Sequence, residues 1–320
     1  GYVDEAEAWR DWLMRAVAGA PAQMQIMYGI RGERRLPEWE VDWLPGFAGS
    51  RPVRVGNGAY DQFQLDVFGE TLDCLHLARH YGLTAAADDW RVERELLGRL
   101  EEVWAEPDEG IWEVRGPKRH FTHSKLMAWV AFDRAVKDVE RFGLDGPADR
   151  WRALRDGLHA EICARAFDPA QNSFVQSYGG REIDAAVLVM AEVGFLPPSD
   201  PRVRGTVAAV ERHLLRDGFV DRYRSDSGVD GLPHGEGAFL LCTFWLADNY
   251  ALMGRGADAR RTFESLLAVR NDVGLLAEEY DPAARRQLGN FPQAFSHLGL
   301  VNTARNLTQR EKPAEVRQNV

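Results

Sequence analysis

Apolar residues recur at spacings of three and four along almost the whole chain, and this period constrains the fold more than any other feature. In residues 87–105, for example, Val92, Leu96, Leu97 and Leu100 fall on one face of a helix. Proline and glycine residues interrupt the pattern at short intervals, so each helix is expected to end before the next begins. The period predicts helical segments over residues 4–19, 60–81, 87–105, 122–141, 146–166, 183–193, 200–216, 237–253, 257–270 and 292–306.

Short connections between these segments predict an all-α fold, because they force consecutive helices to run antiparallel and side by side. Only residues 173–178 and 218–223 have a β-like pattern. No Pro-rich or Ser-rich linker divides the chain, so we expect a single domain over residues 1–320. The helix pairs share no repeated consensus, which favours a closed toroid of helical hairpins over an open solenoid. In such a toroid the loops of one end surround a common funnel.

One long stretch, residues 26–58, departs from the helical period. It is rich in glycine, proline, arginine and tryptophan. Long loops without regular structure inside compact domains are usually functional. We therefore expect this loop to form part of a site.

Charge and composition exclude several classes of partner. The formal net charge is -10, which disfavours a nucleic-acid partner, since such proteins need a concentrated basic face. No run reaches the roughly 18 apolar residues that a membrane span requires. The cysteines Cys74, Cys163 and Cys242 lie far apart in apolar helical patterns, and the first residues are acidic rather than signal-like. These features predict a cytoplasmic protein without membrane partners, and they leave its oligomeric state open.

Two acidic motifs, residues 108–116 and 275–282, carry the strongest functional signal. Each places a carboxylate beside a large aromatic residue in a break between helical segments. Inverting hydrolysis of a glycosidic bond needs one protonated carboxyl as general acid and one carboxylate as general base, about 6.5–9.5 Å apart. Loops that meet at one funnel can supply this pair from distant parts of a sequence.

The residues beside the two carboxylates predict different roles for them. Glu113 directly follows Trp112, and an aromatic wall disfavours the ionised form of a carboxyl group, so Glu113 is the predicted acid. Glu278 precedes Glu279 and Tyr280 in a polar setting, which favours the ionised form and predicts the base. The alternative for both residues is a surface carboxylate that caps a helix or forms an ion pair.

Four sequence blocks, at 36–57, 108–116, 231–255 and 275–304, resemble the bacterial branch of glycoside hydrolase family 15. This family contains glucoamylases, glucodextranases and trehalases. The resemblance implies an (α/α)6 barrel and inverting hydrolysis of α-glucosidic bonds, without a covalent intermediate or a required cofactor. It also implies Glu113 as the acid and Glu278 as the base, with Glu279 in a supporting role.

The substrate implied by the resemblance is a small molecule or an oligosaccharide. Trehalose is the preferred substrate, and α-1,4 or α-1,6 glucans are the alternative. A non-catalytic carbohydrate-binding or scaffold module remains as an interpretation of another class.

Besides Trp112 and Glu279 of the two acidic motifs, further substrate-binding candidates come from the long loop and from the later blocks. Trp39 can stack on a sugar ring or cover the core, and for Trp43 the covering role is favoured. Arg51 and Arg54 can bind sugar hydroxyls or an anion, or tie the loop to a carboxylate. Glu236 begins a helical segment, where it either satisfies exposed amides or, as the resemblance implies, belongs to the sugar site.

Only the resemblance to the family indicates that ions could bind. Some trehalases of this branch are associated with phosphate and magnesium, and Arg51 and Arg54 are the candidates to hold the anion. No metal site is expected from the residues themselves, since His120 and His123 lack the further ligands of a known motif.

The beginning of the chain departs from the family pattern. Members of the family start their barrel with a helix that carries a Trp-x-Arg-Asp segment, and bacterial members precede it with a β-sandwich domain. This chain opens at Gly1-Tyr2, where that helix would have ended. We therefore expect the β-sandwich and the first barrel helix to be absent, and one further helix to lie within residues 26–58. Since sugar positioning supplies much of the rate, the chain should hydrolyse trehalose or maltose weakly or not at all.

Overall fold

The computed structural model describes residues 2–83, 87–224, 237–308 and 313–319. The chain divides into two compact units, residues 1–39 with 55–164 and residues 40–54 with 165–319. The chain leaves the first unit within strand β1 (Trp39–Glu40) and returns to it within strand β2 (Arg54–Val55). Within the described residues, no helix is long and apolar enough to cross a membrane.

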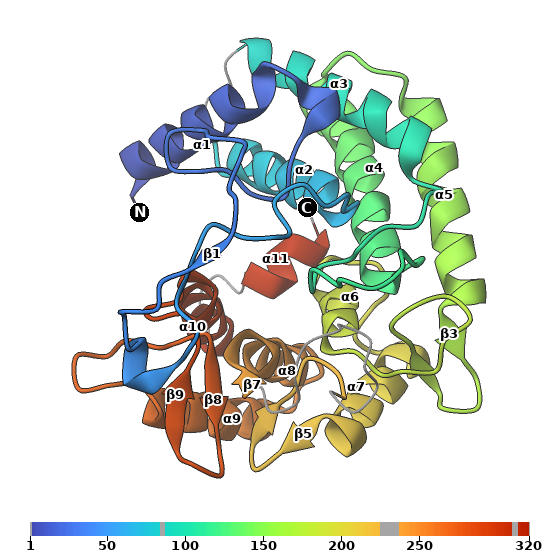
Figure 1. Cartoon of the computed structure of the whole chain (residues 1–320). Coiled ribbons are helices and arrows are strands. Elements are labelled where there is room, and N and C mark those ends of the chain that lie inside the picture. The colour runs from blue at the N-terminus through green and yellow to red at the C-terminus, as the bar shows by residue number, and fades with distance from the viewer. Residues whose placement is uncertain (1, 84–86, 225–236, 309–312, 320) are drawn as a thin grey trace. The chain divides into compact units, whose positions relative to one another are not determined.

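The first unit is helical, and its core lies between α2 and α4, which pack along each other (Figure 1). Phe68 and Leu72 of α2 are buried, as are Leu126 and Val130 of α4. Gly69 permits this close packing, because a Cβ atom there would overlap the backbone of α4. The elements of this unit are α1 (Val3–Ala18), the 3-10 helix η1 (Pro21–Gln23), α2 (Asp66–His80), α3 (Ala87–Val103), α4 (Thr122–Phe142) and α5 (Ala148–Arg165).

Ion pairs inside the first unit join α2 to α4. Arg134 is fully buried, and its Nε donates to Asp73 at 2.7 Å while its Nη1 donates to Asp133 at 2.5 Å. Asp138 accepts from Arg79 and lies 2.6 Å from the Nδ1 atom of His76. A buried charge is tolerated only when it is paired in this way, so these contacts fix how the two helices face each other.

In the second unit, helix α8 (Leu240–Leu252) packs against α9 (Gly256–Ala268) and α10 (Ala294–Leu307). Phe244 and Leu276 belong to the buried apolar cluster of this unit. The remaining helices are η2 (Phe47–Gly49), η3 (Ala185–Leu188), α6 (Val189–Glu192), α7 (Pro201–His213) and α11 (Pro313–Asn319), of which η2 and η3 are 3-10 helices.

Short antiparallel strands complete the second unit. The three-stranded sheet β7-β8-β9 pairs Phe239 with Glu279 and Glu279 with Leu288, so that it fixes the backbone of the second acidic motif. The strands are β3 (Phe167–Asp168), β4 (Ser173–Phe174), β5 (Leu215–Arg216), β6 (Phe219–Val220), β7 (Ala238–Phe239), β8 (Glu279–Asp281) and β9 (Arg286–Leu288).

The ten segments predicted from the helical period all contain helix, and both β-like stretches contain a strand, β4 and β6. Two expectations were wrong. The segment predicted over 60–81 becomes α-helical only at Asp66, and residues 26–58 contain no α-helix. The additional helix is instead α11, near the end of the chain. The single domain expected over residues 1–320 stays a prediction.

Candidate active site

The first acidic motif forms the loop between α3 and α4, and carboxylates of the loop itself hold it in place. The backbone of Asp108 pairs with that of Arg119, and its Oδ2 atom accepts a hydrogen bond from the amide of Leu65 at 2.9 Å. The neighbouring Glu109 accepts from the amide of Phe63 at 3.0 Å through Oε2. These bonds tie the loop to the residues that lead into α2.

Glu113 lies in the middle of this loop in a conformation that few residues adopt. Its φ angle is +54°, in the left-handed region, although it is not a glycine. The side chain is half-buried, and its Oε2 accepts a hydrogen bond from Nδ2 of Asn57 at 3.0 Å. Trp112 beside it is 9 % exposed and so belongs mostly to the core. Strained backbone persists where surrounding contacts enforce it, and such residues cluster at functional sites.

A second set of contacts holds the long loop against this motif within the first unit. The carboxylate of Glu38 accepts from the backbone amide of Gly58 at 3.0 Å and from Nη2 of Arg115 at 3.4 Å. Trp39 follows Glu38 directly, and its side chain is 48 % exposed. The structure therefore brings the segment that carries Trp39 together with the motif that carries Glu113.

Glu278, in the second unit, lies just before strand β8. Its backbone amide donates to the carbonyl of Asn290 at 2.9 Å, and its carbonyl accepts from Leu240 at 3.1 Å. Its Oε2 atom accepts from both the amide and the side-chain Nδ2 of Asn290, at 3.1 and 3.0 Å. Both donors belong to Asn290, so this one residue fixes the position of the Oε2 atom.

Glu279 has different partners from those of Glu278. Its Oε2 accepts from the amide of Gly237 at 3.0 Å, and its Oε1 lies 3.7 Å from a guanidinium nitrogen of Arg222. Glu279 therefore links β8 to the start of β7. These contacts give it a structural task that is separate from that of its neighbour.

The middle of the long loop, residues 40–54, lies against the second motif inside the second unit. Oγ of Ser50 accepts from the amide of Gly289 at 3.3 Å, and Arg286 donates to the carbonyl of Ala48 at 2.9 Å. Phe47 stacks on Phe291, with ring centroids 3.8 Å apart. The loop therefore supports each of the two motifs with a different part of its length.

The remaining predicted residues lie in the long loop or outside the described part of the chain. Arg51 is exposed, and Arg54 is exposed with its Nη2 atom 3.4 Å from Glu40, which matches the interpretation that it ties the loop to a carboxylate. Trp43 is 73 % exposed. Glu236 lies outside the described residues. Among the residues that the structure describes, no cluster of histidine, cysteine and acidic side chains could hold a metal ion.

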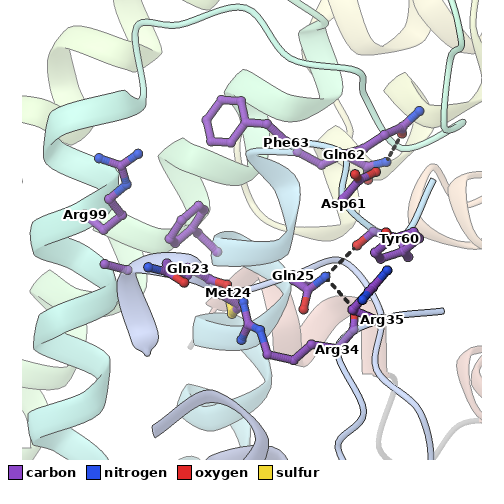
Figure 2. Close-up of a pocket in the computed structure, with 13 residues that line it drawn as sticks. Gln23, Met24, Gln25, Arg34, Arg35, Tyr60, Asp61, Gln62, Phe63 and Arg99 are labelled. Atoms are coloured by element: carbon purple, nitrogen blue, oxygen red, sulfur yellow. Dashed lines mark hydrogen bonds between the residues drawn. The ribbon is translucent and has the colours of Figure 1, made fainter. Parts of the chain in front are cut away.

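A pocket of about 390 Å³ lies in the first unit, behind the residues that support the first motif (Figure 2). Gln62 and Phe63 line it, and the same two residues bond the motif, Gln62 through a 3.3 Å bond from Nε2 to the carbonyl of Val114. Gln25 also lines the pocket, and it donates to the carbonyls of Arg34 and Tyr60. None of the predicted site residues lines this pocket.

Sequence reasoning missed Asn57 and Asn290, which bond the two predicted catalytic carboxylates. A signal for both was present, because Gly-Asn occurs in the sequence only at 56–57 and 289–290. An asparagine in a loop is usually interpreted as a turn residue, and the pattern alone does not reveal its partner.

Substitution of Gly289 tests how closely the second motif is packed. Gly289 has φ of +74°, and a Cβ atom there would lie 2.8 Å from Oε2 of Glu278. We expect Gly289→Ala to displace this carboxylate and to lower kcat as well as stability. Gly274→Ala is the matched control, because φ is +86° there but no atom lies within 4 Å. Backbone strain should lower the free energy of unfolding of both variants by about 1–2 kcal/mol, as measured by urea unfolding. An equal loss of kcat in the two variants would contradict the expected displacement.

Asp108 makes stability depend on pH. Burial raises its pKa to about 6, although the hydrogen bond from Leu65 acts in the opposite direction. The folded state therefore holds this proton more tightly than the unfolded state. The resulting stability is complete below pH 3.8 and is lost as the pH rises through 6.

Asp108→Asn removes this titration and keeps an oxygen that can accept from Leu65. The free energy of unfolding of the variant, relative to the unaltered protein, should increase between pH 4 and pH 7 by at most about 3 kcal/mol. Urea unfolding at several pH values measures this difference. Asp61→Asn, at an exposed position of the same unit, is the control for replacing an aspartate by an asparagine. A constant difference between Asp108→Asn and the unaltered protein would contradict the expectation.

Solved structures with the same fold are glycosidases. A structure described as a wild-type glycosidase matches 96 % of this chain and 83 % of its own, with a TM-score of 0.71 and 21 % identity. A bacterial glucoamylase complexed with acarbose matches 97 % of this chain and 47 % of its own, with a TM-score of 0.73 and 12 % identity. The predicted (α/α)6 fold class is thereby confirmed.

The sequence comparison identifies the family. The model of the glycosyl hydrolases family 15 matches residues 1–305, and the chain belongs to this family. It is 43 % identical over 292 residues to a trehalase of Mycobacterium tuberculosis. The aligned residues make up 91 % of this chain and 43 % of that relative. It is 37 % identical over 310 residues to a trehalase of Thermoplasma acidophilum, with 97 % and 52 % covered. The chain therefore spans about half the length of these relatives.

Proposed function

We propose that this protein hydrolyses α-glucosidic bonds with inversion and that trehalose is its substrate. The observation that carries the proposal is that each acidic motif holds one glutamate with a single carboxylate oxygen bonded by an asparagine, Glu113 by Asn57 and Glu278 by Asn290. Such fixed carboxyl groups are what two-carboxylate hydrolysis requires. The similarity to proteins named trehalase supports the choice of substrate.

In the proposed reaction Glu113 is the general acid. It donates its proton to the glycosidic oxygen as the bond from that oxygen to the anomeric carbon breaks. Glu278 is the general base and takes a proton from the water whose oxygen forms the new bond to the same carbon. One glucose leaves as the alcohol and the other carries the oxygen of the water. Water is the only co-reactant of the sugar, so we propose no required cofactor.

Other residues have subordinate roles in the proposal. Trp39, half-exposed beside the first motif, is the stacking surface for a sugar ring. Glu279 supports Glu278 through its bonds to Gly237 and Arg222. We propose phosphate and magnesium as optional ligands, and the exposed Arg51 as the residue that holds the phosphate. Each ion can be titrated into the protein. If neither sugar binding nor the rate of hydrolysis changes, the ions are not part of the site.

The cellular location is also part of the proposal. The three cysteines, Cys74, Cys163 and Cys242, lie in the helices α2, α5 and α8, within apolar helical patterns. Cysteines used as small apolar side chains of helices suit a reducing compartment, and we propose the cytoplasm.

A panel of glucosides tests the substrate. Release of glucose from trehalose, maltose and isomaltose should be slow, as expected from the start of the sequence, but measurable and fastest with trehalose. Faster release from maltose or isomaltose would indicate a glucan hydrolase of the same family. Binding of these sugars without release of glucose from any of them would indicate the non-catalytic module instead.

A further inference from the structure

The two Gly-Asn dipeptides of the chain occupy equivalent places beside the two proposed catalytic carboxylates. Gly56 and Gly289 have φ angles of +75° and +74°, and each precedes the asparagine that bonds a glutamate. Both bonds run from the asparagine Nδ2 to Oε2 of the glutamate, and both are 3.0 Å long. Each unit thus contains the same local arrangement, a Gly-Asn dipeptide whose asparagine bonds a glutamate, although the two asparagines are 233 positions apart in the sequence.

The contacts of Asn57 fix the orientation of its side-chain amide. Its Oδ1 accepts from the amide of Ala59 at 2.8 Å, which leaves Nδ2 to face Glu113. Its backbone amide donates to the carbonyl of Leu36 at 3.0 Å. Only glycine fits at position 56, because a Cβ there would overlap the carbonyl oxygen of Pro37. The donor that faces Glu113 is therefore held by the backbone on both sides.

Asn290 is held by Glu278 in return. The amide of Glu278 donates to the carbonyl of Asn290, while the amide and Nδ2 of Asn290 both donate to Oε2 of Glu278. This closed set of bonds fixes the rotation of the carboxylate about its last bond. A carboxylate fixed in this way loses little conformational entropy when a substrate binds.

We propose that Asn57 and Asn290 are the positioning residues of the general acid and of the general base. Each holds Oε2 of its glutamate, so that Oε1 is the oxygen presented to the reacting atoms. Asn57 thereby directs the proton of Glu113 at the leaving oxygen, and Asn290 directs the lone pair of Glu278 at the water. This proposal rests on the proposed function, because it assumes the roles of the two glutamates.

Two substrates with different leaving groups separate the two asparagines. Hydrolysis of trehalose needs a proton on the leaving oxygen, whereas α-glucosyl fluoride releases fluoride without such help. Asn57→Ala should lower kcat for trehalose about 10- to 100-fold with little change in KM, and it should leave hydrolysis of α-glucosyl fluoride near its original rate. Asn290→Ala should lower kcat for both substrates by similar factors, because both need the water.

Asn271→Ala is the structural control. Its Oδ1 also accepts from backbone amides, those of Val273 and Leu275, and these two bonds involve no glutamate. This variant should keep the ratio of the two rates, even if it loses stability. If Asn57→Ala lowered both rates equally, or neither, the positioning role would be wrong.

Glu113→Gln distinguishes this failure from failure of the proposed function. If Glu113→Gln loses trehalose hydrolysis but keeps that of the fluoride, Glu113 is the acid and only the role of Asn57 remains in question. If Glu113→Gln keeps trehalose hydrolysis, the proposed function itself fails. Asn57→Asp adds a second variant of nearly the same shape, which removes the donor and should reproduce the selective loss.

Discussion

Glu113→Gln is expected to lower kcat for trehalose about 1000-fold, within the range of 100- to 10,000-fold that general acid catalysis contributes. The amide of glutamine has the shape of the carboxyl group and can still bond Asn57, but it has no acidic proton for the leaving oxygen. KM should change little, because the bonds to the ground-state sugar are unaffected. Steady-state kinetics with trehalose and with α-glucosyl fluoride measure the effect.

Glu109 provides the control within the same motif. Glu109→Gln keeps an oxygen that can accept from the amide of Phe63 and loses only the ion pair of 3.5 Å with Lys118. A long and partly exposed ion pair of this kind contributes little to stability, so the rate should remain close to that of the unaltered protein. A loss in Glu109→Gln as large as that in Glu113→Gln would show that the assignment of the acid is wrong.

Glu278→Gln is expected to lower kcat about 1000-fold for trehalose and for α-glucosyl fluoride alike. Both substrates need an activated water, and the amide cannot accept its proton. The comparison of leaving groups therefore separates the base from the acid. A variant that lost only trehalose hydrolysis would contradict the role of Glu278.

The neighbouring Glu279 is the matched control for the base. Glu279→Gln keeps an oxygen for the amide of Gly237 and weakens the contact with Arg222. We expect some loss of stability and less than about a tenfold loss of kcat, since this residue acts through its neighbour. If Glu279→Gln abolished activity and Glu278→Gln did not, the two roles would be exchanged.

The helical framework could be predicted because each helix buries one face, and burial imposes the period of three and four on the sequence. The beginning of α2 at Asp66 could not be predicted in this way. The apolar pattern continues back to Phe63, but the amides of Phe63 and Leu65 bond carboxylates of the first motif instead of a helical turn. Tertiary hydrogen bonds between distant segments override a local period in this way.

Three short elements, α11, β8 and β9, escaped prediction for a related reason. Helix α11 has seven residues, and strands β8 and β9 have three each. Such lengths are too short to display a period. Their conformation depends on the partners they pair with, such as β7 for β8, and those partners are distant in the sequence.

The two glutamates were predicted because their motifs are distinctive in sequence, and the structure shows how each is held. The asparagines were not, because a side-chain contact between Asn57 and Glu113 spans 56 positions. The exposed position of Arg54 beside Glu40 also depends on how the loop folds back on itself. Sequence motifs thus supplied the two candidate glutamates, and the fold was needed to find the asparagines that bond them.

The anomeric form of the first glucose released from trehalose tests the central claim most directly. Two carboxylates that act as acid and base, with direct attack by water, invert the attacked carbon and leave the other glucose unchanged. Proton NMR or optical rotation in the first moments of the reaction should therefore show α- and β-glucose in equal amounts. Formation of α-glucose alone would indicate retention through a covalent intermediate and would contradict the account.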